Sequence, residues 1–245
     1  PAGWRRDVWV AVLAGPLGTV ASHTTAAALY SLLDPPRAQH VTVPRQASGQ
    51  RGDATVHHAS VDAADRDRVD GIPTTAVART IVDCATILDQ PALNRLTDAA
   101  IGRGFTTLEG IRSARGRAGA LAGAARLREA LAPYAGGIPP GSVKEAHALR
   151  LFRQWKLPPP ECQYVIRNER GEFVAQVDFA WPLFRLALEY DGDEAHAPRK
   201  WSADDDRAET IEALGWRVER ADRHDLRPSS TRLRALLTHL LRQPA

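Results

Sequence analysis

The chain has 245 residues but no methionine, only two cysteines and only three lysines, and aromatic residues make up 6% of it. The two cysteines, Cys84 and Cys162, lie far apart and form no C-x-x-C pair, which argues against a structural zinc site or a disulfide framework. We therefore expect two reduced thiols in a cytoplasmic protein. Because methionine is absent and the chain begins Pro-Ala-Gly, we also expect further sequence upstream.

Charged residues are missing from Val8 to Leu33, a stretch long enough to span a bilayer. A Gly-Pro pair at 15–16, Gly18 and the polar residues 22–25 interrupt it, and in a membrane they would leave polar groups in hydrocarbon. The pattern predicts two core helices joined by a turn and no membrane partner. No secretory signal is recognisable at the N-terminal end.

The positive charge is carried by arginine and lies in the first half of the chain. There are 29 Arg against three Lys, and the net charge of +3 falls within residues 1–137, since residues 138–245 are balanced. Arginine suits bidentate contacts to phosphate, but a GC-rich genome produces the same bias. Six Arg and one acid lie between Arg103 and Arg128. This strip is either a nucleic-acid contact, with Arg115 and Arg117 as candidates, or a solvated helix face.

A Gly-Gly pair at 136–137, a Pro-Pro pair at 139–140 and Gly141 predict a domain boundary. Residues 1–137 then form a helix-rich α+β domain, and residues 138–245 form a second domain. In the first, apolar spacing predicts helices, strands at 40–44 and 55–58, a loop or hairpin tip at 45–53 and a turn into a helix N-cap at 71–75. The predicted helices are 7–14, 24–33, 76–88, 90–103 and 107–115.

In the second domain, capping and turn residues mark the ends of the predicted elements more clearly. A helix is expected from Ser142 to Trp155, where Ser142-x-x-Glu145 forms a capping box, and three prolines at 158–160 end it. The order α-β-β-β-α-β-α predicts an α/β fold whose mixed sheet is flanked by helices. The remaining expected elements are strands 162–167, 173–180, 185–191 and 216–220 and helices 202–214 and 229–241.

Acidic side chains gather at one end of this predicted sheet. Glu189 and Asp191 share a strand face because side chains alternate, and Asp178 on the preceding strand can lie across from Glu189. Clustered carboxylates are costly unless a cation neutralises them, and oxygen-only ligands suit Mg²⁺ or Mn²⁺. The alternative is a set of solvated surface acids.

An ordered string of motifs across about residues 140–228 resembles a bacterial nuclease family, the very-short-patch repair (Vsr-like) endonucleases of the PD-(D/E)XK superfamily. The resemblance implies a restriction-endonuclease-like core, hydrolysis of DNA, and Mg²⁺ as cofactor, with Mn²⁺ as a substitute. It also implies that Asp178 and Glu189 are metal ligands and that Glu145 acts from the first helix. The string comprises Glu145, Pro160-x-x-Gln163, residues 177–182, residues 188–192, His196, Asp206-Arg207 and residues 215–220.

By the same resemblance His196 is a proton donor or phosphate contact, and Asp206 and Arg207 orient the site or contact phosphate. We take Lys200 and Arg207 as candidate contacts to nucleic acid. Asp191 stands where the superfamily usually has Lys. We therefore expect Asp191 to bind the metal or a metal-bound water, and His196 or Lys200 to supply the missing donor.

The first half resembles the region that follows the winged helix in AbiEi-type antitoxin and regulator proteins. The residues that carry this resemblance are 21–29 and Gly71-Ile-Pro-Thr-Thr75 followed by Arg79-Thr-Ile-Val-Asp83. Such proteins normally begin with a winged helix-turn-helix, which this chain lacks. Two functions stay open: a Mg²⁺-dependent DNA endonuclease, or a DNA-binding regulator or antitoxin-like protein whose nuclease fold is catalytically idle. An interaction protein that never touches nucleic acid is a third.

Overall fold

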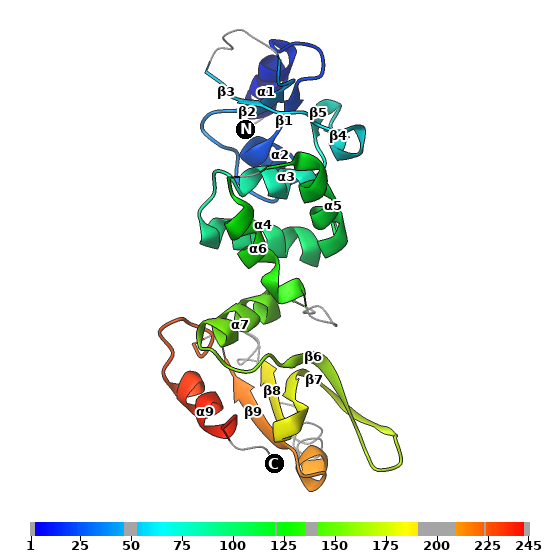
Figure 1. Ribbon diagram of the computed structural model, residues 1–245, viewed down its shortest axis with the longest axis vertical. Coiled ribbons are helices and arrows are strands. Elements are labelled where there is room, and N and C mark those ends of the chain that lie inside the picture. Colours follow the sequence, from blue (N-terminus) through cyan, green and yellow to red (C-terminus); the bar gives the residue numbers. More distant parts are fainter. Residues whose placement is uncertain are drawn as a thin grey trace. The chain divides into compact units, whose positions relative to one another are not determined.

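The computed structural model describes residues 3–46, 53–120, 122–135, 142–190, 209–222 and 224–242. The chain divides into two compact units, Pro1–Leu131 and Ala132–Ala245 (Figure 1). This division precedes the predicted linker, because the short turn η2 (Ala132–Tyr134) contacts helix α7 (Val143–Gln154) of the second unit.

The first unit contains a five-stranded mixed sheet with the order β3-β2-β1-β5-β4. The two outer pairs differ: β2 and β3 are parallel, whereas β4 and β5 are antiparallel. Inside the sheet, β1 pairs antiparallel with β2 and parallel with β5. The strands are β1 (Val20–Ala21), β2 (His40–Val43), β3 (Thr55–His58), β4 (Arg66–Val69) and β5 (Ile72–Thr75).

One sequence-based expectation for this unit was wrong, and a second is narrowed. Residues 72–75, expected to be part of a turn, form strand β5, and the turn lies before it at Asp70 and Gly71, where φ is +50° and +81°. Two successive positive φ values suit a tight hairpin between antiparallel strands, and Asp-Gly is a favoured pair there. Of the two alternatives for residues 45–53, a loop or a hairpin tip, the hairpin tip is excluded, since β2 and β3 are parallel.

Helices cover the sheet and build a second core beyond it. Val8 and Val12 of α1 pack against Ala21, Val41 and Ile72 of the sheet, whereas α2 to α6 share a helical core (Figure 1). The uncharged stretch 8–33 therefore holds the two expected core helices with the short strand β1 between them. The helices are α1 (Gly3–Leu13), α2 (His23–Leu29), α3 (Val77–Cys84), α4 (Gln90–Gly102), α5 (Leu108–Ala118) and α6 (Ala124–Leu131).

The second unit contains a four-stranded mixed sheet with the order β6-β7-β8-β9. The first three strands are successive antiparallel neighbours, and β9 adds to β8 in parallel after a crossover. The α/β class and the mixed sheet predicted for this half are thereby confirmed. The strands are β6 (Glu161–Arg167), β7 (Phe173–Trp181), β8 (Leu186–Tyr190) and β9 (Arg217–Ala221).

Each face of this sheet has its own core. Phe152 of α7 and Leu233 and Leu237 of α9 (Arg232–Leu240) pack with Phe179 and Leu188 on one face. On the other face Ile211, within the helical residues 209–213, packs with strand residues such as Val177 and Ala187. Across the part of the chain that the structure describes, no helix combines the length and apolar character needed to cross a membrane.

We expect Phe179→Ala to lower the free energy of unfolding by about 3–5 kcal/mol, because it leaves a cavity in the core of the second unit. The Phe179 ring is 1% exposed and meets Phe152 edge-on, with ring centroids 5.3 Å apart. Phe173 begins the same strand and is 63% exposed, so Phe173→Ala is the matched control. Urea unfolding followed by tryptophan fluorescence measures both, and equal losses would contradict the assigned core.

Candidate functional site

The candidate site lies at the point in β6 and β7 where the regular alternation of side chains between the two faces of the sheet is interrupted. Cys162 pairs with Phe179 and both join the core on the α7 side, whereas Tyr164 and Val177, the next pair, pack on the opposite side. Gln163, between them, has a left-handed backbone with φ +51°. Local irregularities of this kind re-aim side chains and cluster at functional sites.

The Gln163 side chain joins the two carboxylates that the sequence singled out at this end of the sheet. Its Nε2 donates to Glu145 Oε2 at 2.9 Å and to Asp178 Oδ1 at 3.3 Å. Its Oε1 accepts a hydrogen bond from Gln176 Nε2 at 3.0 Å, which fixes the orientation of the amide. Both hydrogens of one neutral amide are therefore directed at acidic side chains from two different elements.

Glu145 takes part in the helix N-terminus and in this site together. Ser142 is the N-cap of α7: its Oγ accepts a hydrogen bond from the Glu145 backbone N at 3.1 Å and donates to Glu145 Oε1 at 3.0 Å. The second carboxylate oxygen is the one that Gln163 binds. Glu145 is 7% exposed, so its charge is held in a largely desolvated position.

Strand β8 ends beside the same group. The backbone N of Tyr190 donates to Asp178 Oδ2 at 2.9 Å, and the paired register of β7 and β8, continued by one residue, sets Glu189 opposite Asp178. Lys144 at the start of α7 places its Nζ 5.0 Å from the centre of the Tyr190 ring. A cation thus lies close to the acidic end of the sheet.

The negative potential at this site acts on a neighbouring thiol. Burial is the main cause that raises the pKa of Cys162 to about 11, and the charges of Glu145 and Asp178 raise it further. Cys162 and Cys84 are both free, as the sequence predicted, and both are buried. The Cys162 thiol therefore stays protonated at neutral pH and is no nucleophile there.

The oxygen donors fit a divalent cation chemically, but they are not gathered as three ligands around one point. Within the described ranges, the single group of three potential ligand residues whose ligand atoms all lie within 4.8 Å of one another is His23, His40 and His57, in the first unit. Glu145 and Asp178 instead share one amide, which offsets less charge than a divalent cation would.

Several predicted site residues cannot be placed. Asp191, His196, Lys200 and Arg207 lie outside the described residues, so their expected roles as metal ligand, proton donor and nucleic-acid contacts stay predictions.

Arg115 and Arg117, the two candidate DNA contacts of the first unit, both lie in the last turn of α5 and have intramolecular partners. Arg115 donates to the backbone oxygen of Gly119, and Arg117 Nε donates to Asp65 Oδ1 at 3.1 Å. Asp65 is buried, so the bond from Arg117 compensates a desolvated charge. A role of either arginine toward DNA stays a prediction.

The Arg79–Asp83 motif lies in the same buried network. Arg79 Nε donates to Asp83 Oδ1 at 2.8 Å, one helical turn along α3, and Arg79 Nη1 lies 3.5 Å from Asp65 Oδ2. Burial raises the pKa of Asp83 to about 6, against the opposing effect of Arg79. This part of the resemblance to regulator proteins therefore has a structural explanation.

Sequence reasoning missed two neighbours of the carboxylates and the histidine group. Gln163 belongs to the motif string, but no periodicity indicates that its amide bridges two acids. Lys144 is one of three lysines in the chain and directly precedes Glu145, which was the available signal. His23, His40 and His57 are far apart in sequence, and only the sheet register brings them together.

Comparison with known proteins gives relatives but no function. The chain is 36% identical over 179 residues to proteins described as uncharacterized from two strains of Mycobacterium tuberculosis, CDC 1551/Oshkosh and ATCC 25618/H37Rv. The match covers 71% of this chain and 64% of the length of each relative. No family model matches the chain, and no solved structure matches it significantly.

Substitutions at Glu145 separate its helix-capping contacts from its charge. We expect Glu145→Gln to change stability little, because a glutamine can accept from Gln163 and donate to the Ser142 hydroxyl. Glu145→Ala should cost about 1–2 kcal/mol, because it leaves the partners of a buried group unpaired. Urea unfolding in the presence of a chelator measures both variants, and equal stability of the two would contradict the hydrogen bonds described.

Proposed function

We propose that the second unit is a Mg²⁺-dependent DNA endonuclease domain with a restriction-endonuclease-like core. The observation that carries the proposal is the convergence of Glu145 from α7 and Asp178 from β7 on Gln163, beside the last two residues of β8, Glu189 and Tyr190. Acidic groups from separate elements are costly to gather at one sheet end, and a structural role alone does not require it.

The order of elements supports the same proposal. A helix, three antiparallel strands, a crossover and a parallel strand are the arrangement that the motif resemblance implies, and the acidic residues that the resemblance singles out belong to α7, β7 and β8. The resemblance to very-short-patch repair endonucleases supplies the reaction class, because neither topology nor acidity specifies DNA by itself.

Asp178 and Glu189 would hold the ion by resemblance, and Asp191, which stands where the superfamily usually has Lys, is expected to bind the ion or an ion-bound water. A bound Mg²⁺ lowers the pKa of a ligated water and stabilises charge on the phosphate oxygens. Glu145 would orient or accept a proton from water at the edge of the site, held by Ser142 and Gln163. Lys144, exposed beside Tyr190, is placed to attract the phosphate backbone of the substrate.

One observation favours the alternative, a DNA-binding regulator with an idle nuclease fold. The carboxylates of Glu145, Asp178 and Glu189 do not form a group with ligand atoms within 4.8 Å of one another. In that alternative the Gln163 amide would be the permanent partner of the two acids. DNA binding that weakens with salt, without cleavage in any divalent metal, would be its signature.

To test the proposal, the full chain is incubated with supercoiled and linear DNA in Mg²⁺, Mn²⁺ or EDTA. We expect cleavage with either metal and none with EDTA. Asp178→Ala and Glu189→Ala should abolish cleavage, because each removes an ion ligand. Glu145→Gln, which keeps the capping contacts, should lower the rate by about 10–100-fold, as is typical when a group that supports a metal site is changed.

Glu169→Ala is the matched control, since Glu169 is exposed in the turn between β6 and β7, and it should cut DNA at the wild-type rate. Cleavage at the wild-type rate in Asp178→Ala or Glu189→Ala would contradict the assignment of these residues as ion ligands. Full activity in Glu145→Gln alone would mean that Glu145 caps the helix and has no role in cleavage.

A further inference from the structure

Three histidines from distant parts of the first unit lie on one side of its sheet. His40 begins β2 and His57 is the third residue of β3, and the parallel register pairs His40 with Thr55 and Thr42 with His57. Alternate residues of a strand share a face, so both imidazoles project on the same side. One residue, Ser22, separates His23 from the end of β1, and the backbone N of Ser22 donates to His40 O at 3.0 Å.

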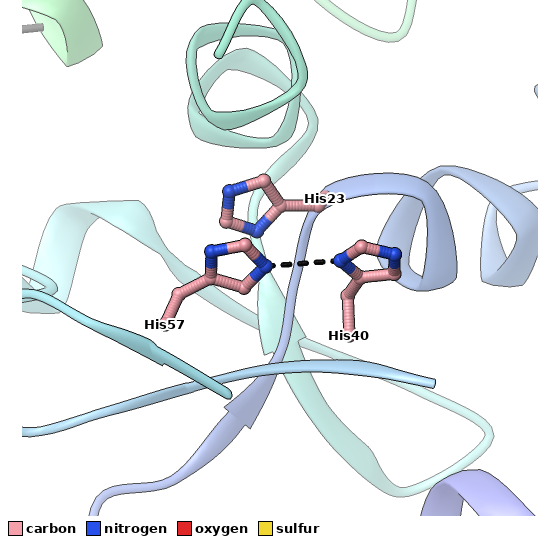
Figure 2. A group of neighbouring side chains, drawn as sticks. All are labelled: His23, His40 and His57. Carbon is pink, nitrogen blue, oxygen red and sulfur yellow. Dashed lines mark hydrogen bonds between the residues drawn. The ribbon is translucent and has the colours of Figure 1, made fainter. Parts of the chain in front are cut away.

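The rings are close enough to act on one ion. His40 Nδ1 lies 2.9 Å from His57 Nε2, and the ring of His23 stacks on that of His57 with centroids 3.6 Å apart. A ligand nitrogen from each of the three residues lies within 4.8 Å of the other two. Figure 2 shows His23 above His57, with His40 beside them.

All three imidazoles are neutral at physiological pH, which is the state that binds metals. Burial, and then the charges of the other two histidines and of Arg79, lower the pKa of His23 to about 2. Burial is also the main cause that lowers the pKa of His57 to about 4, and it lowers the pKa of His40. The positive charge of Arg79 is balanced by its own bonds to Asp83 and Asp65.

The start of α2, where His23 lies, has no side-chain cap and has an unusual backbone conformation. Ser22 is the N-cap residue of α2, but its side chain makes no capping bond. Its Oγ instead lies 2.9 Å from His23 Nδ1 and accepts a hydrogen bond from Thr42 Oγ1 at 2.8 Å. His23 itself has φ +51°. A lost cap and a left-handed non-glycine residue each cost about 1 kcal/mol or more, and such costs concentrate at functional sites.

The set of donors indicates which ion would bind. Imidazole nitrogen suits Zn²⁺ and its neighbours Co²⁺ and Ni²⁺ rather than Mg²⁺, and no carboxylate belongs to the group. His23 is 4% exposed, whereas His40 and His57 are half-buried, so the group opens toward solvent on the β3 side. Three nitrogen ligands with room for a water are a known arrangement for zinc.

We propose that His23, His40 and His57 form a binding site for one divalent transition-metal ion of the zinc class, with water as the fourth ligand. The ion replaces the hydrogen bond between His40 and His57 and ties the start of α2 to strands β2 and β3. All three ligands of this site belong to the first unit, whereas Glu145, Asp178 and Glu189 belong to the second, so its test does not require DNA cleavage.

Metal binding to the full chain, stripped with a chelator and then dialysed, tests this proposal. In excess Mg²⁺, which would fill the carboxylate site of the second unit, we expect one equivalent of Co²⁺ to bind, with visible absorption bands of an ion in a nitrogen-rich site of low coordination number, and Zn²⁺ to displace it. Zn²⁺ should also raise the Tm of the first unit. His40→Ala and His57→Ala should weaken binding by more than about 100-fold, since even changes around metal ligands cost up to that much.

His58→Ala is the matched control, because His58 is exposed, is adjacent to His57 and points to the opposite face of β3. It should bind Co²⁺ as the wild type does. Circular dichroism establishes that the half-buried variants keep their fold. Two results would contradict the proposed metal site: a chain that binds no stoichiometric Co²⁺ or Zn²⁺, or His40→Ala and His57→Ala variants that bind with wild-type affinity. In either case the three histidines would be a stacked cluster without a metal.

Discussion

Buried polar side chains need partners, and this requirement shapes both units of the protein. A carboxylate or guanidinium taken out of water is tolerated only when other groups bind it. In the first unit, Arg79 sits between Asp83 and Asp65 and thereby ties α3 to the segment that precedes β4. In the second, Gln163 holds two acids that approach from α7 and β7. The difference is that the first network matches charges, whereas the second gathers like charges around a neutral amide.

That contrast separates architecture from function. In the arginine network, Arg79 and Arg117 offset the charges of Asp65 and Asp83, although Asp83 Oδ2 is buried without a hydrogen bond. Stability is sufficient to explain this motif. The acidic site and the histidine group have less local explanation. The first gathers two carboxylates from different elements on one neutral amide, and the second packs three imidazoles beside a helix N-cap residue whose side chain makes no capping bond. Function is expected at sites where residues violate local structural preferences and no neighbouring interaction offsets the cost.

How far the sequence predicts this structure depends on how local each signal is. The second sheet follows from apolar runs between strong turn signals, so its strands and its parallel last strand were predictable. The first sheet was largely missed. Strand β1 has only two residues, too few for a periodicity, and β5 contains Pro73 and buried threonines in place of an apolar run. The Asp70-Gly71 pair was the overlooked hairpin signal.

Within the candidate site, the motifs indicated Glu145 and Asp178. The bridging role of Gln163 depends on its left-handed backbone, and the histidine group depends on the register of the strands. Neither feature can be predicted from the motifs or the periodicity of a single sequence.

The central claim is that the acidic end of the second sheet binds a divalent cation. The most direct measurement is anomalous diffraction from crystals of the full chain soaked in Mn²⁺. The account predicts a peak at about 2.1 Å from a carboxylate oxygen of Asp178, the distance expected for a small hard cation, with Glu189 on its other side. A map at saturating Mn²⁺ with no peak beside Asp178, and with the Gln163 amide still bridging Glu145 and Asp178, would contradict it.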